Sequence, residues 1–579
     1  MSGLRANDQP TKIRKMAYSI ENQEMVKELK HKLRGRLPRA WEQLVRYAWE
    51  LRTRFSLLEP LIFQQLRKVS AELRRENPVP AGKKILFFQT RSNAPHLSWA
   101  GTMAMALRIR GHQTMFLGCS RELSASCNNA NYPDGLSGAR CRSCFLYTRR
   151  FFELSGIDTR WIGGYVGPTD YRRAETMVSS LSSDQYEAFE YNGIHLGQIV
   201  RHSVAHYLRT GSIGNDALSL AVYRKFLINS IIVADASTKL LDEYDPDVVA
   251  MLCGLFMPEH VMMKLAHARG KRVVVYEIGM LAQDALMLQH DRPIDYDDRD
   301  GWERFKSRPL SEEENNILDE YLFERSQGRM SVVNYWPEKE DDERTIRTTL
   351  GIDPTKRTAV LFPNITWDSA LFDKDIAFQG MFDWLDRTIE YFTLHPQYQL
   401  IIRAHPAEVI LPGSLRESVI LYINEKYPAL PNNIILVGPE SKISSYTLMD
   451  MSQCGLSYAS TTAIELGIRG VPVLVAGEVH FRRKGFTVDI EDAASYHQNL
   501  DHVLADACPL SRETIVEMAR RYAYFTFFRT SMPFRKIHCG AGDQPVFTYD
   551  QISDLLPGKD KSLDIICNGI VSGTPFIFE

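Results

Sequence analysis

Short apolar strands alternate with helices in two separate series along this chain, and this alternation restricts the fold more than any other feature. In the first series, a strand and polar loop at 83–93 lead into a helical stretch at 95–112, and a second strand follows at 113–119. A second series of the same kind begins at residue 356. Strands that alternate with helices form parallel sheets with helices on both faces. We therefore predict an α/β fold with two Rossmann-like domains.

The length of 579 residues fits two or three domains. We predict a basic helical extension (1–80), a first Rossmann-like domain (81–305), a helical connector (306–350), a second Rossmann-like domain (351–530) and a helical C-terminal segment (531–579). Open α/β sheets bind ligands at the carboxyl ends of their strands, so a cleft between the two domains is expected to hold the ligand. The sequence contains neither G-x-G-x-x-G after a first strand nor a P-loop, which argues against NAD and against a P-loop nucleotide site.

Charge and hydropathy exclude further classes. The formal net charge of −2 argues against a nucleic-acid partner. No uninterrupted apolar run reaches the roughly 20 residues that span a bilayer, and the N-terminus lacks a signal-peptide core, so we expect a cytoplasmic protein. Residues 1–80 are nevertheless basic, with Trp41 and Trp49 among their aromatic residues. Two interpretations stay open: peripheral contact with the inner face of a membrane, or helices that pack on the protein body.

A cluster of hydroxyl residues opens a helix in the second domain. Ser460, Thr461 and Thr462 follow an apolar strand, and their hydroxyl and backbone N–H groups are expected to face a phosphate. Glu465 lies on the same helix, where its carboxylate is expected to accept hydrogen bonds from a ribose. The alternatives are a plain Ser/Thr N-cap and a carboxylate that complements the helix dipole.

Histidine and basic residues follow the neighbouring strands. His405 ends a strand in the segment Arg-Ala-His-Pro, where it can donate to a phosphate or protonate a leaving group. Arg403 either adds positive charge there or points away by strand alternation. Lys484 follows Arg482 and Arg483 in a loop after the strand VPVLVAG, where it can neutralise the phosphates of a nucleotide or remain a solvated surface charge.

These segments resemble a known family. RAHP, SYASTTAIELGIRGVPVLV and HFRRKGFTVD are similar to the C-terminal half of the capsule polysaccharide biosynthesis glycosyltransferases, a Kdo-transferase-like group with the GT-B fold. The His-Pro and Ser/Thr motifs are also similar to those of bacterial sialyltransferases that use CMP-sugars. The resemblance is clearest over about 355–495 and is weaker in the first domain, where VVVYEIGML matches an E-x-G segment at Glu277 and Gly279.

The resemblance implies specific contacts on the donor side. It assigns His405, Ser460 and Thr461 to the CMP portion of a nucleotide-sugar donor. It also places Asn364, with Trp367 and Asp368, near the cleft.

Sugar transfer needs a base near the acceptor hydroxyl and stabilisation of the departing phosphate. Glu277, at the carboxyl end of a first-domain strand, is our first candidate base, and His96, in the loop after the first strand, is the second. Glu259 with His260 is the third, and an ordinary loop or cap role is the alternative for each. GT-B enzymes generally need no catalytic metal, and the resemblance implies the same for this chain. Asp245-Pro-Asp247 is better interpreted as a turn than as a metal-binding D-x-D motif.

Four of the nine cysteines lie close together in the sequence: Cys119, Cys127, Cys141 and Cys144. Their C-x7-C-x13-C-x2-C spacing makes a structural zinc site a candidate, although the first spacing is long for such a site. Free buried thiols and an occasional disulfide are the alternatives.

The leading hypothesis is a glycosyltransferase. Its donor substrate is a nucleotide-sugar, for which a CMP-sugar is one option. Its acceptor is expected to be a surface polysaccharide or a lipid-linked glycan. A CDP-glycerol-type glycerophosphotransferase is the first alternative because it resembles this chain in the same motifs. A non-catalytic nucleotide- or glycan-binding protein that keeps the GT-B fold is the second.

Overall fold

The computed structural model describes residues 60–76, 81–92, 94–127, 137–281, 285–328, 338–410, 416–538 and 545–579. Most of the basic stretch considered for membrane contact, residues 1–59, lies outside the described residues. The chain divides into two compact units, Met1–Gln64 and Gln65–Glu579. Helix α3 (Leu61–Glu76) spans the boundary, and both large sheets belong to the second unit.

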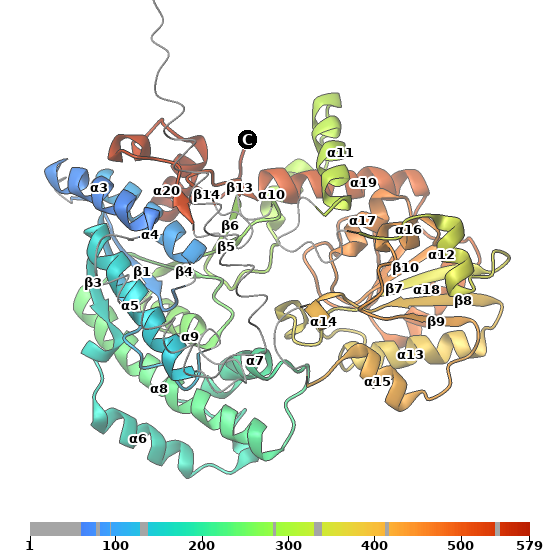
Figure 1. Ribbon diagram of the computed structural model, residues 1–579, viewed down its shortest axis with the longest axis horizontal. Coiled ribbons are helices and arrows are strands. Elements are labelled where there is room, and N and C mark those ends of the chain that lie inside the picture. Colours follow the sequence, from blue (N-terminus) through green and yellow to red (C-terminus); the bar gives the residue numbers. More distant parts are fainter. Residues whose placement is uncertain are drawn as a thin grey trace, which may run out of the picture. The chain divides into compact units, whose positions relative to one another are not determined.

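The first sheet has seven strands in the order β13-β6-β5-β4-β1-β2-β3 (Figure 1). Its strands are β1 (Lys84–Gln89), β2 (Gln113–Gly118), β3 (Asp158–Trp161), β4 (Val248–Leu252), β5 (Arg272–Ile278), β6 (Ala285–His290) and β13 (Met532–Pro533). Strands β3, β2, β1, β4 and β5 are parallel, whereas β6 runs antiparallel to β5 and β13 antiparallel to β6. The parallel part has the doubly wound order, in which the chain reverses direction across the sheet between β1 and β4.

Helices cover this sheet and close its core. They are α4 (Ala94–Ile109), α5 (Ser137–Ser155), α6 (Pro168–Ser179), α7 (Leu196–Leu208), α8 (Ala217–Tyr244), α9 (Met257–His267) and α20 (Lys561–Ser572). Helix α10 (Arg299–Phe305) instead buries Trp302 in a different hydrophobic core. Helix α4 packs with α20 and α5, while α8 packs with α6, α7 and α9. Because helices bury the sheet, β1 is a continuous apolar run in which Ile85 to Phe88 are fully buried.

The second sheet has six strands, all parallel, in the order β12-β11-β10-β7-β8-β9. The strands are β7 (Arg357–Phe362), β8 (Tyr398–Arg403), β9 (Ile434–Val437), β10 (Cys454–Ser457), β11 (Val473–Val475) and β12 (Val488–Asp489). Its helices are α13 (Met381–Leu394), α14 (Ala407–Ile410), α15 (Val419–Lys426), α16 (Ser445–Asp450), α17 (Thr462–Ile468), α18 (Ala493–Leu504) and α19 (Arg512–Tyr524). Read from β9 to β12, the strand order is that of the Rossmann fold.

Successive residues along a strand of the second sheet pack into two separate hydrophobic cores. Val360 and Ile401 lie in one core with residues of α17 and α19, whereas Leu361 and Ile402 lie in the other with residues of α13 and α18. Successive side chains of a strand point to opposite faces, so both faces of this sheet are buried. The predicted α/β class with two Rossmann-like sheets is confirmed.

The segments after the first α/β series differ from the sequence-based expectation. The acidic stretch after β5 is preceded by strand β6 and contains helix α10, and neither element was predicted. Helices α11 (Glu312–Ser326) and α12 (Glu343–Leu350) connect the two sheets along the chain. Segment 531–579 is not only helical, because it supplies β13 to the first sheet and the small hairpin of β14 (Ile537–His538) and β15 (Val546–Phe547).

One helix in the described part of the chain, α8, is long and apolar enough to cross a membrane by length and composition. In its most apolar window, 61% of the residues are buried inside the structure. Its cap residue Asp216 accepts hydrogen bonds from Leu218 N and Ser219 N. The packing against α6, α7 and α9 therefore accounts for its apolar composition.

Candidate functional site at the carboxyl edges of the sheets

Two loops meet where the second sheet reverses its winding direction, between the adjacent strands β7 and β10. Asn364 follows β7 and is only 6% exposed. Its side-chain oxygen accepts a hydrogen bond from Ala459 N, in the loop after β10, at 3.1 Å. Such a switch point is where open α/β sheets bind ligands. The structure thus brings Asn364 to the loop that carries Ser460.

The hydroxyl residues of this loop form a connected group. Thr462 Oγ1 donates to Ser460 Oγ at 3.0 Å, and Ser460 N donates to Ser457 Oγ at 3.0 Å. Thr461 occupies the N-cap position of α17 but makes no side-chain cap hydrogen bond. Because α17 has only 7 residues, the hydroxyl groups, rather than a long helix dipole, are the groups that can interact with an anion here.

His405 lies on the next strand connection, after β8. Its Nδ1 accepts a hydrogen bond from Ala407 N at 3.0 Å, so the neutral ring carries its proton on Nε2. Burial lowers the pKa of His405, the charge of Arg403 lowers it further, and Asp368 opposes both. His405 is therefore arranged as a hydrogen-bond donor at the same sheet edge as Asn364.

Glu465 is already engaged by a cation. Its carboxylate accepts a hydrogen bond from Arg325 Nε, on α11, at 3.0 Å, and Glu465 is only 4% exposed. The expected ribose contact would have to share this carboxylate with Arg325. Nothing in the sequence connects these two residues, which are 140 positions apart.

Arg403 is also committed within the domain. It is 2% exposed, and its guanidinium donates to the carbonyl oxygens of Ala404, Gly438 and Ser441. Burial lowers the pKa of Arg403 to about 10. Arg403 therefore braces the loops that follow β8 and β9, and the predicted phosphate contact does not fit this placement.

The three basic residues of the loop between β11 and β12 are each paired. Lys484 Nζ donates to Asp297 Oδ1 at 2.9 Å, and both residues are buried. Arg482 is buried against backbone carbonyls and Glu491, and Arg483 contacts Glu478. A bound nucleotide would therefore have to displace a carboxylate to use Lys484.

Replacing Asp297 is expected to destabilise the protein, because the buried Lys484 charge then has no carboxylate partner. Burial raises the pKa of Asp297, but hydrogen bonds from Arg299 and Lys484 outweigh it and hold that pKa below its usual value. Asp297→Asn should therefore lower the free energy of unfolding by about 3 kcal/mol at pH 7, because Lys484 is left unpaired. The measurement is thermal unfolding at pH 7 and in steps down to pH 3.

The sign of the pH effect follows from the depressed pKa of Asp297. Its stabilising contribution is present above the unfolded-state pKa of about 3.9 and is lost as pH falls through the lower folded-state value. The difference between wild type and Asp297→Asn should accordingly shrink below pH 4. Asp300→Asn, at an exposed position near Asp297, is the matched control and should change stability by less than about 0.5 kcal/mol. A difference that does not shrink at all as pH falls from 7 to 3 would contradict the assignment.

On the first sheet, Glu277 and His96 face one another at the carboxyl edge. Glu277 ends β5, and its Oε1 lies 3.9 Å from His96 Nε2. Burial, together with the charge of Arg91, lowers the pKa of His96 to about 3, so the ring is neutral at pH 7 and the contact is not an ion pair. Burial raises the pKa of Glu277, against the hydrogen bond from Ile278 N and the charge of Arg91. A carboxyl with a raised pKa beside a neutral imidazole is suited to proton transfer.

Arg91 was not predicted from the sequence. It lies just after β1, at the switch point of the first sheet, and its NH2 group is 2.6 Å from Glu259 Oε2. Glu259 is 1% exposed and also accepts a hydrogen bond from Thr90. Glu259 is thus neutralised by its ion pair with Arg91. Glu277 makes no such close ion pair with Arg91 among the described contacts, so Glu277 is the better candidate base.

Tyr296 is a second residue that sequence reasoning missed. It has a left-handed backbone conformation with a φ of 61°, uncommon for a bulky residue. Burial raises the pKa of its hydroxyl, and the charges of Glu277 and Asp368 add to this effect. Tyr296 therefore stays protonated and lies within electrostatic reach of both Glu277 and Asp368. Its position in an acidic, loop-like stretch offered no signal.

The four clustered cysteines are all described, but the structure does not gather them as a zinc site requires. No group of three or more His, Cys, Asp or Glu side chains is placed to hold a metal ion among the described residues. Burial raises the pKa of Cys119, and Cys141 is also buried. The zinc site stays a prediction that this arrangement does not support.

Asp245 and Asp247 lie away from the carboxyl edge of the first sheet. Asp245 caps the end of α8 with a φ of 50°, and Asp247 accepts a hydrogen bond from the backbone N–H of Lys84, the first residue of β1. The two carboxylates therefore stand at the amino end of the strands. This placement agrees with a structural turn.

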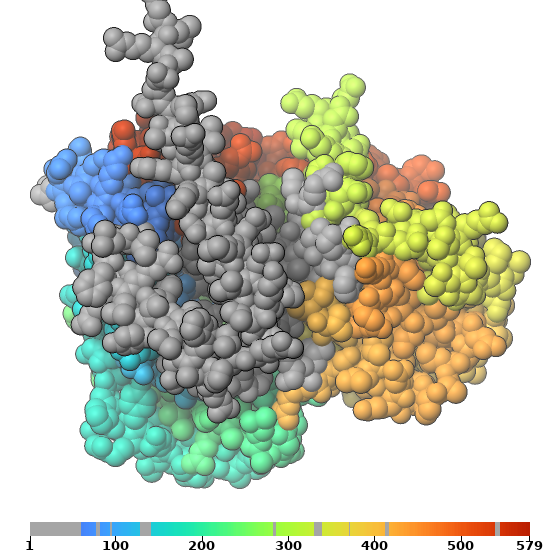
Figure 2. Space-filling model, viewed as in Figure 1, coloured from blue at the N-terminus to red at the C-terminus, as the bar shows by residue number. Residues whose placement is uncertain are grey.

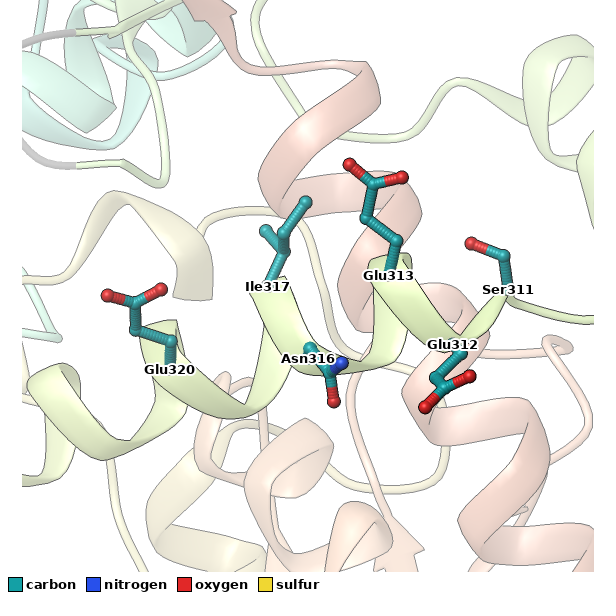
Figure 3. Close-up of a pocket in the computed structure, with 6 residues that line it drawn as sticks. All are labelled: Ser311, Glu312, Glu313, Asn316, Ile317 and Glu320. Carbon is teal, nitrogen blue, oxygen red and sulfur yellow. The ribbon is translucent and has the colours of Figure 1, made fainter.

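A surface hollow also runs along α11, lined by Ser311, Glu312, Glu313, Asn316, Ile317 and Glu320 (Figure 3). Five of these side chains come from this one helix and Ser311 is its N-cap, and the helix stands out from the neighbouring surface in Figure 2. Three carboxylates repel a phosphate, and among the described residues only α11 and its N-cap line the hollow. We therefore place the candidate site at the sheet edges instead.

No protein-family model and no curated protein matches this chain. Among solved structures, it is similar to UDP-GlcNAc 2-epimerase from Neisseria meningitidis bound to UDP-GlcNAc, with 10% identity and a TM-score of 0.24 over 76% of this chain and 99% of that one. The β Kdo 2,4 transferase KpsC of Thermosulfurimonas dismutans shares 13% identity, with a TM-score of 0.32 over 54% of this chain and 87% of that one. A glycosyltransferase from Rickettsia africae shares 9% identity, with a TM-score of 0.27 over 77% and 94%. At these TM-scores the likenesses carry no argument, and the α/β class rests on the sheet topology.

Proposed function

We propose that this chain is a glycosyltransferase that moves a sugar from a nucleotide-sugar donor to a glycan acceptor. The observation that carries the proposal is the hydrogen bond from Ala459 N to Asn364, which joins the hydroxyl loop to the switch point of the second sheet. His405, with its proton on Nε2, follows the strand next to β7. Hydroxyl, amide and imidazole donors at one sheet edge suit a phosphate ester.

The pairing of nearby cations favours a donor with a single phosphate, such as a CMP-sugar. Lys484 is held by Asp297, Arg325 by Glu465, and Arg403 by backbone carbonyls. A diphosphate usually needs a cation or a metal to neutralise its second charge. Neutral donors and one histidine match the lower charge of a nucleoside monophosphate ester.

In this proposal, Glu277 accepts the proton of the acceptor hydroxyl as that oxygen attacks the anomeric carbon. The bond from the anomeric carbon to the phosphate oxygen breaks, and His405 with the hydroxyl groups of Ser460 and Thr461 stabilises the departing phosphate. Direct displacement of this kind inverts the anomeric centre. Neither step calls for a catalytic metal.

The acceptor belongs to the same proposal. A surface polysaccharide or a lipid-linked glycan is the acceptor that the sequence resemblance favours. Residues 1–80 would then bring the protein to the inner face of the membrane, where a lipid-linked acceptor is found.

Nucleotide binding tests the donor site directly. CMP at 100 times its Kd is expected to stabilise the protein by about 2.7 kcal/mol, and His405→Ala and Ser460→Ala should remove most of this stabilisation. The measurement is thermal shift with CMP, UDP, GDP and CDP at equal concentration. His395→Ala is the matched control, because His395 ends helix α13 before the amino end of β8 and its Nδ1 contacts the Tyr391 carbonyl oxygen at 2.7 Å.

The outcome of this screen separates the alternatives. Stabilisation by CMP, together with turnover of a CMP-sugar, supports the glycosyltransferase. Preference for CDP-glycerol would favour glycerophosphotransfer, and binding without turnover would favour the non-catalytic protein. If no nucleotide stabilises the protein, the donor site is wrongly assigned.

A further inference from the structure

The loop between α7 and α8, in the first domain, binds one carboxylate of the second domain. Gly211 N donates to Glu417 Oε2 at 2.6 Å, and Ser212 N donates to the same oxygen at 3.3 Å. Ser212 Oγ donates to the other carboxylate oxygen, Oε1, at 3.2 Å. All three residues belong to the compact unit Gln65–Glu579. Two residues of one loop therefore supply three donors to a single carboxylate.

The two domains approach so closely at Gly211 that a side chain there would collide. A Cβ atom on Gly211 would lie 3.0 Å from the Thr366 carbonyl oxygen and 3.2 Å from Glu417 Oε2. Both distances are shorter than an ordinary van der Waals contact of a Cβ atom. A glycine is therefore needed for the first domain to reach Glu417 in this way.

Glu417 in turn is bonded to the turn after β7. Thr366 Oγ1 donates to the Glu417 carbonyl oxygen at 2.9 Å, and Thr366 is only 1% exposed. Thr366 stands two residues after Asn364, which accepts the hydrogen bond from Ala459 N. The turn that reaches the hydroxyl loop of the candidate donor site is thus connected, through Thr366 and Glu417, to the first domain.

The same part of the first domain contacts this turn at further points. The Arg209 guanidinium lies 5.8 Å from the centre of the Trp367 ring. The His202 ring stacks on Phe372 with 4.6 Å between ring centres, and His202 Nε2 lies 2.9 Å from Asp373 Oδ2. Residues 366–373 are therefore held against the end of α7 as well as by Glu417.

We propose that Glu417 is a positioning residue, which the first domain binds through Gly211 and Ser212 and which thereby holds the turn that carries Asn364 in place for the nucleotide. This inference rests on the proposed function for the identity of the ligand, but not for the connection between Glu417 and the turn. Glu417 acts through Thr366 and need not touch the nucleotide.

The physical basis is preorganisation. Hydrogen bonds to a carboxylate are stronger than those between neutral groups, so their loss leaves a surface loop free to sample other conformations. A ligand that binds one conformation then loses affinity in proportion to the fraction of molecules that adopt it. Removing the Glu417 carboxylate should accordingly loosen the turn after β7 and weaken nucleotide binding together.

The first test measures hydrogen exchange of the turn in the ligand-free full chain. Asp368 N and Leu371 N close this turn by donating at 3.0 Å to the Ile365 and Asp368 carbonyl oxygens. Glu417→Ala should raise the exchange rate of amides in 365–373 several-fold. Gly211→Ala changes only the first domain and should raise the same rates, which a purely local role of Gly211 does not predict.

The controls change the same residue types nearby. A Cβ atom on Gly214, in the same loop, would come no closer than 3.4 Å to its neighbours, so Gly214→Ala should leave the turn unchanged. Glu425→Ala, at an exposed position on α15, should do the same. Thermal melts establish that every variant is folded.

The second test measures CMP affinity in the same variants. Glu417→Ala and Gly211→Ala should each weaken CMP binding several-fold, and the double variant should be no weaker than the weaker single variant, because both changes break one contact. Gly214→Ala and Glu425→Ala should bind CMP as the wild type does.

Unchanged exchange of 365–373 in both Glu417→Ala and Gly211→Ala would overturn the inference, whatever binds. If the exchange rises but no variant and not the wild type binds CMP, the connection between Glu417 and the turn stands and the proposed donor is wrong. If CMP binds both variants with wild-type affinity, the donor site stands and the positioning role of Glu417 is refuted.

Discussion

Arg482→Ala is expected to lower the free energy of unfolding of the second domain by about 3 to 5 kcal/mol. The Arg482 guanidinium is fully buried, with 0% side-chain exposure, and donates to the carbonyl oxygens of Val475 and Ile490. Its removal takes away the guanidinium donors of Ile490 O and leaves Val475 O with only the hydrogen bond from Ile490 N, and a buried unsatisfied group costs about 1 to 3 kcal/mol. The lost packing of the long side chain adds to this. In a thermal melt, the midpoint should fall by roughly 10 °C.

Arg483→Ala is the matched control for Arg482→Ala. It changes the same residue type at the next position, but Arg483 is more than half exposed, at 54%, and its ion pair with Glu478 lies at the surface. Exposed pairs contribute about 0 to 1 kcal/mol, so the midpoint should move by no more than one or two degrees. Equal effects of the two substitutions would show that the buried hydrogen bonds of Arg482 do not stabilise the domain.

Glu277→Gln is expected to lower kcat by about 100-fold to 10,000-fold, because an amide cannot accept the acceptor proton. The side chain keeps its size, and an amide oxygen can also accept the hydrogen bond that Glu277 receives from Ile278 N. The wild-type rate should rise with pH through the raised pKa of Glu277 and then level off, since a base must be deprotonated. The measurement is the pH profile of kcat with a CMP-sugar donor and an isolated glycan acceptor.

The binding readout separates chemistry from folding in this variant. CMP should stabilise Glu277→Gln as much as it stabilises the wild type, because Glu277 lies on the first sheet and the donor site on the second. Glu243→Gln, at an exposed position on α8, should leave kcat unchanged. Full activity in Glu277→Gln, or loss of its ability to bind CMP, would move the base to another residue.

The alternation of strands and helices predicted both parallel sheets, because a buried strand and the helix that follows it are local patterns. The antiparallel strand β6 was missed, since it follows β5 with an acidic continuation and contains only four buried positions. Strand β13 pairs with β6 from a distant part of the chain, and its two residues carry no periodicity of their own. Pairing over such a distance has no sequence signal that one chain can supply.

The sequence predicted which residues lie at the candidate site, but it did not predict their ion-pair partners. The loop of Ser460 and the strand end at His405 were found because motifs after parallel strands share one edge of a sheet. The partners that decide the charge of the site were not found, as with Asp297 for Lys484 and Arg325 for Glu465. A basic run in a sequence does not reveal which carboxylates neutralise it.

The return of segment 531–579 to the first sheet has a consequence for how the protein is made. During synthesis, β6 emerges long before its neighbour β13, and α4 emerges even longer before α20, which packs on it. All strands of the second sheet lie between these partners in the sequence and can pair without them. The second domain is therefore complete on the ribosome first, while the first keeps an open sheet edge. We therefore expect chaperones to bind mainly the first domain during translation, because it is synthesised earlier but completed later.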